Sequence, residues 1–230
     1  MFRADPEPYV FEHFSVSHWA VLALLAAGLL FLYRNKGSIV SRKCEVAVGI
    51  SLLLMEAAYQ AFLLSTGQWS VRHSLPIELS SITVQLTALL LIFRWKWLFQ
   101  FMFLFAVGGA AQAMVTPVLS YDFPHFRFIH FFYTHMLAVL VMFYFRWGEG
   151  WPVYFRHIGV SWLGLNLMVP FIWIINTRTG GNYWFIMRPP SGRSILDFFG
   201  PQPWHFIGMQ AAALFFFFLL WILVGSRRKT

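Results

Sequence analysis

Long apolar runs alternate with short polar connections along the whole chain. Seven of these runs are long enough to cross a bilayer, which takes about 20 apolar residues per helix. They cover residues 15–33, 45–65, 76–93, 96–115, 126–145, 153–176 and 203–225. A spanning helix satisfies its own backbone hydrogen bonds, so apolar runs of this length are suited to the hydrocarbon. We therefore predict an all-α polytopic membrane protein, a bundle of seven transmembrane helices forming one domain over residues 1–230.

The third and fourth runs are separated only by Arg94 and Trp95, with Lys96 at the start of the fourth run. One continuous helix through both runs would be far longer than a single crossing requires. A tight hairpin at these three residues is the better interpretation.

Charge orients the predicted bundle. Of the 17 basic residues, 11 lie in the connections and tail that would share one side of the membrane. They are Arg34, Lys36, Arg42, Lys43, Arg94, Lys96, Arg146, Arg156, Arg227, Arg228 and Lys229. The positive-inside rule places this side in the cytoplasm. The amino terminus has Asp5, Glu7 and Glu12 against Arg3 alone, so we expect it outside and the carboxyl terminus inside.

Composition agrees with a membrane protein that carries no soluble domain. The chain is 59% hydrophobic, 20% aromatic and 11% charged, with a mean hydropathy of +0.63. Its net charge of +8 does not indicate nucleic-acid binding, because the basic residues sit at span ends and form no basic helix.

Cys44 is the single cysteine, so no disulfide within the chain and no thiolate metal site is expected. The first run is long and follows an acidic leader, so we do not expect it to be a cleaved signal peptide. It should remain in the protein as the first helix.

Most polar residues inside the runs fall in the half that faces outward in this orientation. Glu56 and Gln60 are four apart, and Glu78, Ser81 and Gln85 follow a three-and-seven spacing, so each set shares one helix face. The predicted chamber residues are Glu56, Tyr59, Gln60, Glu78, Ser80, Ser81, Gln85, Gln112, His130, Thr134, His135, Asn166, Asn176 and Asn182. Because polar groups in hydrocarbon line a cavity or pair with one another, we predict one polar chamber in the outer leaflet.

Each of these residues also has a structural interpretation. Serine and threonine in membrane helices commonly bond back to a carbonyl one turn earlier, and amides such as Gln85 and Asn166 tie helices together. Glu56 and Glu78 differ, because an unpaired carboxylate in hydrocarbon is costly and intramembrane ionisable groups are functional candidates. A structural hydrogen bond from histidine to either carboxylate is the alternative.

His135 is the first candidate for a catalytic residue. An imidazole titrates near neutrality in water and can act as a general base if a neighbouring group orients it. Metal binding by the histidines with Glu56 and Glu78 is the less favoured alternative, because neither HExxH nor a comparable spacing is present. No metal and no cofactor is therefore expected.

Several segments together resemble a known family. They are LPIELS at residues 75–80, GGAAQAMVTP at 108–117, YDFPHFRFIHFFYTH at 121–135, the pair Asn182-Tyr183, and LDFFGPQPW at 196–204. The combination resembles the YwaF-like family of bacterial integral membrane proteins. That family is in turn distantly similar to the eukaryotic transmembrane protein 164 acyltransferases, which use Cys and His within the membrane to move acyl chains onto lysophospholipids. It is also similar to fatty-acid-ester hydrolases that use Thr and His.

The resemblance supports His135 as the general base, because it corresponds to the family's histidine. It also implies a location in the bacterial inner membrane. It does not supply a nucleophile. Family members often carry His and Cys after the Leu-Pro pair, whereas this chain has Glu78 and Ser80, and the eukaryotic Cys would fall near Ile77. Gln202 and His205 replace the more usual aromatic residues around the Pro-Trp pair.

These residues lead to one preferred function and two rivals. A lipid acyl hydrolase or acyltransferase could use a hydroxyl of Ser80, Ser81 or Thr134, with amide donors from Gln112, Asn176 or Asn182 for the oxyanion. Direct attack without an acyl intermediate is equally open. Arg127, Arg188 and Arg193 are candidates for contacting a lipid phosphate, or else pair with Asp122 and Asp197. The expected partners are membrane lipids, with no nucleic acid. The rivals are a small-solute transporter or ligand-binding membrane receptor, and a structural membrane protein.

Overall fold

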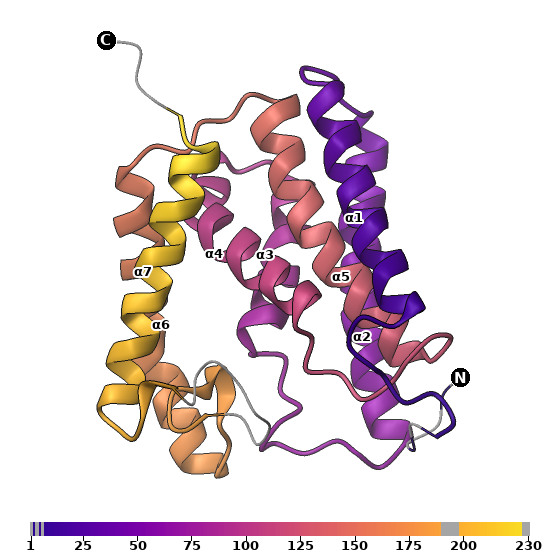
Figure 1. Cartoon of the computed structure of the whole chain (residues 1–230), viewed down its shortest axis with the longest axis vertical. Coiled ribbons are helices and arrows are strands. Elements are labelled where there is room, and N and C mark those ends of the chain that lie inside the picture. Colours follow the sequence, from indigo (N-terminus) through magenta and orange to yellow (C-terminus); the bar gives the residue numbers. More distant parts are fainter. Residues whose placement is uncertain (1, 3–4, 6, 190–197, 227–230) are drawn as a thin grey trace.

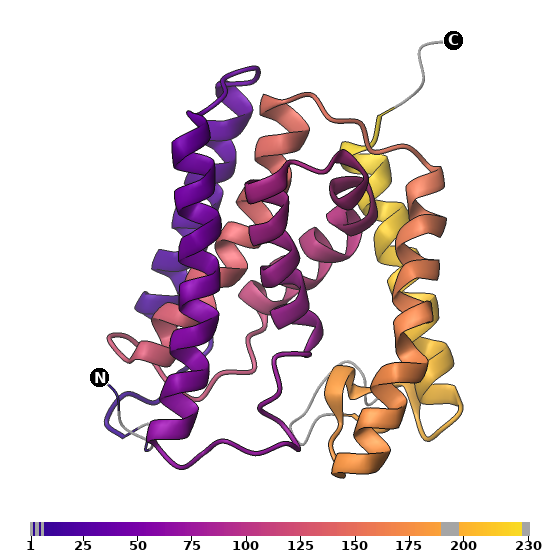
Figure 2. The ribbon, with the colours of Figure 1, turned by 180° about the vertical axis from the view of Figure 1, so that it is seen from behind.

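Residues 2, 5, 7–189 and 198–226 are described by the computed structural model. In this part of the chain the α-helices are α1 (Val16–Arg34), α2 (Arg42–Ser65), α3 (Leu79–Phe93), α4 (Lys96–Val115), α5 (Phe126–Phe143), α6 (Arg156–Thr179) and α7 (Trp204–Val224). A short π-helix, η1 (Tyr144–Gly148), continues α5, and η2 (Tyr183–Phe185) is a 3-10 turn. Successive helices run in alternating directions along the long axis (Figures 1 and 2). We call the end at which α1, α3, α5 and α7 begin the outer end.

The predicted all-α polytopic fold is confirmed. Six of the helices are long and apolar enough to cross a membrane, and α3 is a shorter apolar helix of 15 residues. The predicted third run extends from residue 76, but the helix begins only at Leu79, with Glu78 at its N-cap. Among the described residues the only extended pairing is an isolated bridge between Val10 and Tyr121.

Local sequence explains where the helices begin and end. Ser15 and Ser41 are the N-caps of α1 and α2, and their hydroxyls accept hydrogen bonds from backbone N–H groups inside the first turn. Arg94 adopts a left-handed conformation with φ of 55°, which ends α3. Helix α4 then begins at Lys96, so the tight hairpin expected between the third and fourth runs is present.

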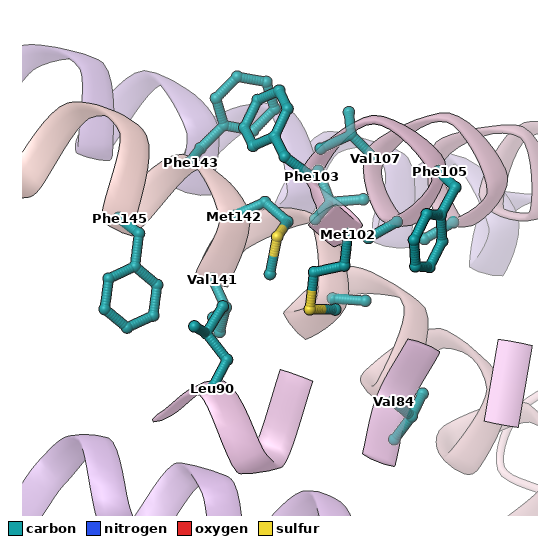
Figure 3. Packing of buried hydrophobic residues seen from close by; sticks show 14 of the residues in the cluster. Val84, Leu90, Met102, Phe103, Phe105, Val107, Val141, Met142, Phe143 and Phe145 are labelled. Carbon is teal, nitrogen blue, oxygen red and sulfur yellow. The ribbon is translucent and has the colours of Figure 1, made fainter. Parts of the chain in front are cut away.

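The hydrophobic core lies between α4 and α5, which form the centre of the bundle. Phe99, Met102 and Phe103 of α4 and Met142 of α5 are fully buried. They belong to one cluster with Val84 and Leu90 of α3, part of which is shown in Figure 3. Large apolar side chains from three helices therefore fill the inner half of the bundle.

Helices α6 and α7 are peripheral. Both have mostly exposed apolar surfaces, as expected for helices that face lipid. They pack on α4, which crosses the molecule diagonally and moves away from α7 toward the outer end (Figure 1). A Cβ added at Gly108 of α4 would lie 3.5 Å from Leu220 of α7, so the two helices are close at that level.

A network of charged and polar side chains closes the inner end, opposite the predicted chamber. Glu45 is buried and accepts hydrogen bonds at 2.6 Å from both the Tyr144 hydroxyl and Arg42. Arg94 lies 3.7 Å from the same carboxylate and also pairs with Glu149. Arg42 additionally donates to carbonyls at the end of α3. The network therefore joins α2, α3 and the π-helix that follows α5.

Candidate functional site

A small polar pocket lies at the outer end between α2, α3 and α5. Its volume is about 180 Å³. It is lined by Glu56, Tyr59, Gln60, His73, Ser74, Leu75, Glu78, Ser80, Ser81, Val84, Arg127, His130, Phe131, Thr134 and His135. Ten of the predicted site residues are among them, contributed by three helices and by residues before α3. We call this space the polar pocket.

His135 is held in one orientation by its own helix. Its Nδ1 lies 2.7 Å from the carbonyl oxygen of Phe131, one turn earlier, and its ring stacks on the Phe131 ring with 4.2 Å between centroids. Because a carbonyl only accepts, Nδ1 must carry the proton. The lone pair of a neutral imidazole is then on Nε2, which forms no hydrogen bond with the described residues. This is the tautomer that a general base requires.

A second histidine belongs to a closed chain of polar contacts. Arg127 donates from Nη1 to Nδ1 of His130 at 2.9 Å, which leaves Nε2–H to donate to Glu56 Oε1 at 3.2 Å. Tyr59 stacks on His130, and the Arg127 guanidinium lies 4.2 Å from the centre of the Tyr59 ring. Both nitrogens of His130 are therefore occupied, and the residue positions Glu56 rather than offering a base. The other oxygen of Glu56, Oε2, is buried and forms no hydrogen bond with a described residue.

The three predicted hydroxyl nucleophiles differ in their surroundings. Thr134 donates back to the carbonyl of His130 at 2.8 Å and is buried, as threonine commonly does in membrane helices. Ser81 lines the polar pocket only. Ser80 is exposed at the start of α3 and lines both the polar pocket and a second cavity beside it. Among the three, Ser80 has the position that suits a nucleophile.

The second cavity is larger and its walls are mainly apolar. Its volume is about 790 Å³, within the range typical of ligand sites. Its wall includes Leu79, Thr83, Phe105, Gly109, Ala110, Gln112, Ala113, Leu119, Ala138, Trp184, Phe185 and Met209. Glu78, Ser80, Val84 and His135 line both spaces. We call this space the apolar cavity, and these four residues form the wall that it shares with the polar pocket.

The outer wall of the apolar cavity is a strained turn fixed by Glu78. Trp184 and Phe185 have φ angles of 61° and 52°, which residues with side chains adopt rarely and only where surrounding contacts impose it. Glu78 Oε2 accepts from the backbone N–H of Trp184 at 3.2 Å, and the Trp184 indole donates to the carbonyl of Ile77 at 2.7 Å. The start of α3 therefore helps to hold this turn, together with His205, whose Nε2–H donates to the carbonyl of Phe185 at 2.8 Å.

Residues 13–221 match the TMEM164 family, which is nearly the entire chain. The chain belongs to the TMEM164 family. No curated protein and no solved structure shows a significant match to this TMEM164-family protein.

Some of the predicted chamber residues of this TMEM164-family protein lie outside both cavities. Gln85 donates to the carbonyl of Pro76, and Asn166 donates to Gln210, which ties α6 to α7. Asn176 is buried and binds both backbone groups of Tyr183, at 3.0 and 2.7 Å. Asn182 donates to the carbonyl of Arg188. These four amides form structural contacts, so the two asparagines proposed for the oxyanion are not placed to serve it.

The predicted headgroup residues are also separated. Arg127 lines the polar pocket, whereas Arg188 is exposed and lines neither cavity. Arg193 lies outside the described residues. Gln112 faces the apolar cavity rather than the polar pocket. Within the described residues no group of three or more His, Cys, Asp or Glu side chains is arranged to hold a metal ion.

Several wall residues of this TMEM164-family protein were missed by sequence reasoning. His73 and Ser74 precede α3, and Trp184 and Phe185 belong to the turn between α6 and α7. Residues in connections have no helical periodicity to assign them to a face. The neighbouring Leu75-Pro76 and Asn182-Tyr183 pairs were the available signal. Tyr183 links the two segments, because its hydroxyl donates to Val71 and accepts from the N–H of Leu75. Burial raises the pKa of this phenol.

Proposed function

We propose that this protein is a lipid acyl hydrolase or acyltransferase in which His135 acts as the general base. The observation that carries the proposal is the shared wall, where His135 and Ser80 lie between a polar pocket and an apolar cavity. A lipid acyl ester has the same division, since its carbonyl joins a hydrocarbon chain to a polar head. An ester with its chain in the apolar cavity and its alcohol part in the polar pocket would present its carbonyl to these two residues.

The proposed chemistry has two steps when Ser80 is the nucleophile. His135 Nε2 takes the hydroxyl proton as the Ser80 oxygen attacks the carbonyl carbon, and the alcohol of the ester then leaves with that proton. Water, or the hydroxyl of an acceptor lipid, next gives its proton to His135 and attacks the acyl-serine. The bond from the acyl group to Ser80 breaks, His135 returns the proton to the serine oxygen, and a fatty acid or a new ester is released. In the alternative route, His135 activates water or the acceptor directly and no acyl-enzyme forms.

The remaining residues support binding and charge stabilisation in this proposal. Gln112 lies on the wall of the apolar cavity, where its amide N–H groups would donate to the developing oxyanion. Arg127 uses one nitrogen for His130 and has further N–H donors for a phosphate in the polar pocket. The substrate class would accordingly be phospholipid or lysophospholipid.

We further propose seven crossings with the amino terminus outside and the carboxyl terminus in the cytoplasm. The alternating helix directions and the basic residues near the inner end support this orientation. The segments at residues 75–80 and 121–135 support membership of the YwaF-like bacterial subfamily, hence a bacterial inner membrane. Ser80 in place of the usual cysteine is the main departure from that pattern.

A transporter is the rival function, and packing of the inner half argues against it. Phe99, Met102, Phe103 and Met142 are fully buried in the region that an inward-facing path would have to cross. Opening such a path would require separating these buried side chains and losing their contacts.

The decisive experiment uses the full-length protein in lipid nanodiscs with acyl-labelled phospholipid and lysophospholipid. We expect turnover by the wild type and a loss of about a hundredfold or more in His135→Ala, the range for removing a general base. His157→Ala is the matched control, because His157 is a buried histidine that lines neither cavity. Wild-type protein that turns over no lipid but takes up a solute saturably into proteoliposomes would favour the transporter.

A further inference from the structure

The wall of the apolar cavity contains an exposed glycine, which the wall of a closed chamber would not have. Gly109 of α4 is exposed and also lines the cavity. A Cβ added at Gly109 meets no atom within 4 Å, whereas the Cβ at neighbouring Gly108 would contact Leu220 of α7. The cavity is therefore open to the outside at Gly109, just beyond the level at which α7 packs on α4.

Small residues of α4 create the volume of the cavity. Gly109, Ala110 and Ala113 lie on its wall from α4, and Ala138 does so from α5. Met209 of α7 also contributes to the wall. Since protein interiors are otherwise close-packed, a cavity of about 790 Å³ persists here because these positions carry almost no side chain.

The surroundings of the opening identify the medium it faces. Helix α7 contributes Met209 to the cavity wall, and its Ile207 and Leu214 are apolar and 50% and 38% exposed. Exposed apolar side chains on a helix of a membrane protein face hydrocarbon. An opening beside this helix is reached from the side, through the bilayer.

We propose that the opening beside Gly109 is the lateral entrance for one hydrocarbon chain of a membrane lipid, and that Gly109 determines which chains are accepted. This inference rests on the proposed function, because it supplies the route by which the acyl chain reaches His135. A chain that moves from the bilayer into the cavity exchanges one apolar environment for another, so the hydrophobic effect does not drive its binding. Selection then depends on van der Waals contact and free volume, which a side chain at Gly109 would change directly.

The chain provides a closely matched control for this position. Gly159 is an exposed glycine within α6, a Cβ added there also meets nothing within 4 Å, and it lines neither cavity. Gly109→Leu and Gly159→Leu therefore add the same group at an open helical position and gain similar helix propensity. Gly109→Ala adds only a methyl group at the same position.

The experiment measures chain binding separately from chemistry. Full-length protein in nanodiscs is photolabelled by phospholipids that carry a diazirine on acyl chains of different lengths, and the labelled protein is quantified by mass spectrometry. We expect Gly109→Leu to lower labelling by the long chain at least about tenfold relative to the short chain, because one excess methylene in a filled pocket discriminates to about this extent. The ratio of long-chain to short-chain labelling in Gly109→Ala should lie between those of the wild type and Gly109→Leu. In Gly159→Leu this ratio should equal that of the wild type.

Each outcome decides a different claim. Equal chain-length profiles for Gly109→Leu, Gly159→Leu and wild type would overturn the entrance, even if the wild type hydrolyses lipid. A profile that changes only in the Gly109 variants would support the entrance, even if no turnover is found and the proposed chemistry fails.

Discussion

Glu78 accepts a hydrogen bond from the backbone N–H of Trp184 at 3.2 Å, which joins the start of α3 to the turn that walls the apolar cavity. The same residue lines both spaces of the site. A carboxylate so placed can either hold the turn or take part in proton transfer, and the two roles are separable.

Glu78→Gln is expected to keep most of the activity, because the amide oxygen still accepts from Trp184, whereas Glu78→Ala should lose both the bond and the order of the turn. Hydrogen exchange at the Trp184 and Phe185 amides checks this, with faster exchange expected only in Glu78→Ala. Glu78→Gln that is inactive but normally protected would show instead that the charge itself is needed.

Ser80 and Ser81 form a natural test pair, since only Ser80 lines the shared wall. If Ser80 is the nucleophile, Ser80→Ala should lower turnover by more than about a thousandfold. Ser81→Ala should have little effect. An acyl-protein adduct trapped from short incubations would be present in Ser81→Ala and missing in Ser80→Ala. Full activity in Ser80→Ala would leave direct attack as the mechanism.

Removal of Glu56 should destabilise the outer half of the bundle. Glu56→Ala leaves Nε2–H of His130 buried without its acceptor, which costs about 1–3 kcal/mol. Glu56→Gln retains an acceptor oxygen and should lose less. Thermal unfolding followed by tryptophan fluorescence gives the comparison. Gln60→Ala is the control from the next helical turn, because its bond to Trp69 is exposed; equal losses at the two positions would contradict the prediction.

The inner-end network should affect stability without affecting chemistry. Glu45→Ala removes the acceptor of the buried Tyr144 hydroxyl and should cost about 1–3 kcal/mol, with about 1 kcal/mol for Tyr144→Phe. Turnover per folded molecule should stay at the wild-type level in both variants, since the network lies at the opposite end from the site. A selective loss of turnover would reveal coupling between the two ends.

The exposed Cys44 provides a built-in test of orientation. A membrane-impermeant maleimide should label it in inside-out vesicles and leave it unlabelled in right-side-out ones. Val71→Cys in a Cys44→Ser background should give the reverse pattern, because Val71 is exposed in the connection at the outer end. Labelling of Cys44 from the outside would invert the proposed topology.

Helical spacing in the sequence was enough to predict much of the polar pocket. The Glu56 to Gln60 spacing and the position of His135 placed these residues correctly at one pocket, because period and depth determine which face and level of a helix a residue occupies. The same reasoning could not place Asn176 or Asn182, since their amides are taken by a turn whose left-handed residues follow no regular pattern. It also could not reveal the apolar cavity, which depends on how far α4 and α7 diverge.

The shortness of α3 has a consequence for the membrane itself. Its 15 residues rise about 22 Å at 1.5 Å each, less than the hydrocarbon thickness of about 30 Å. The residues before it, which approach the site as irregular backbone, can exist at that depth only where protein or water satisfies their amide and carbonyl groups. Protein groups supply such partners here, because the Tyr183 hydroxyl accepts from the N–H of Leu75 and Gln85 donates to the carbonyl of Pro76. The irregular segment before α3 can therefore lie below the membrane surface while shielded from lipid.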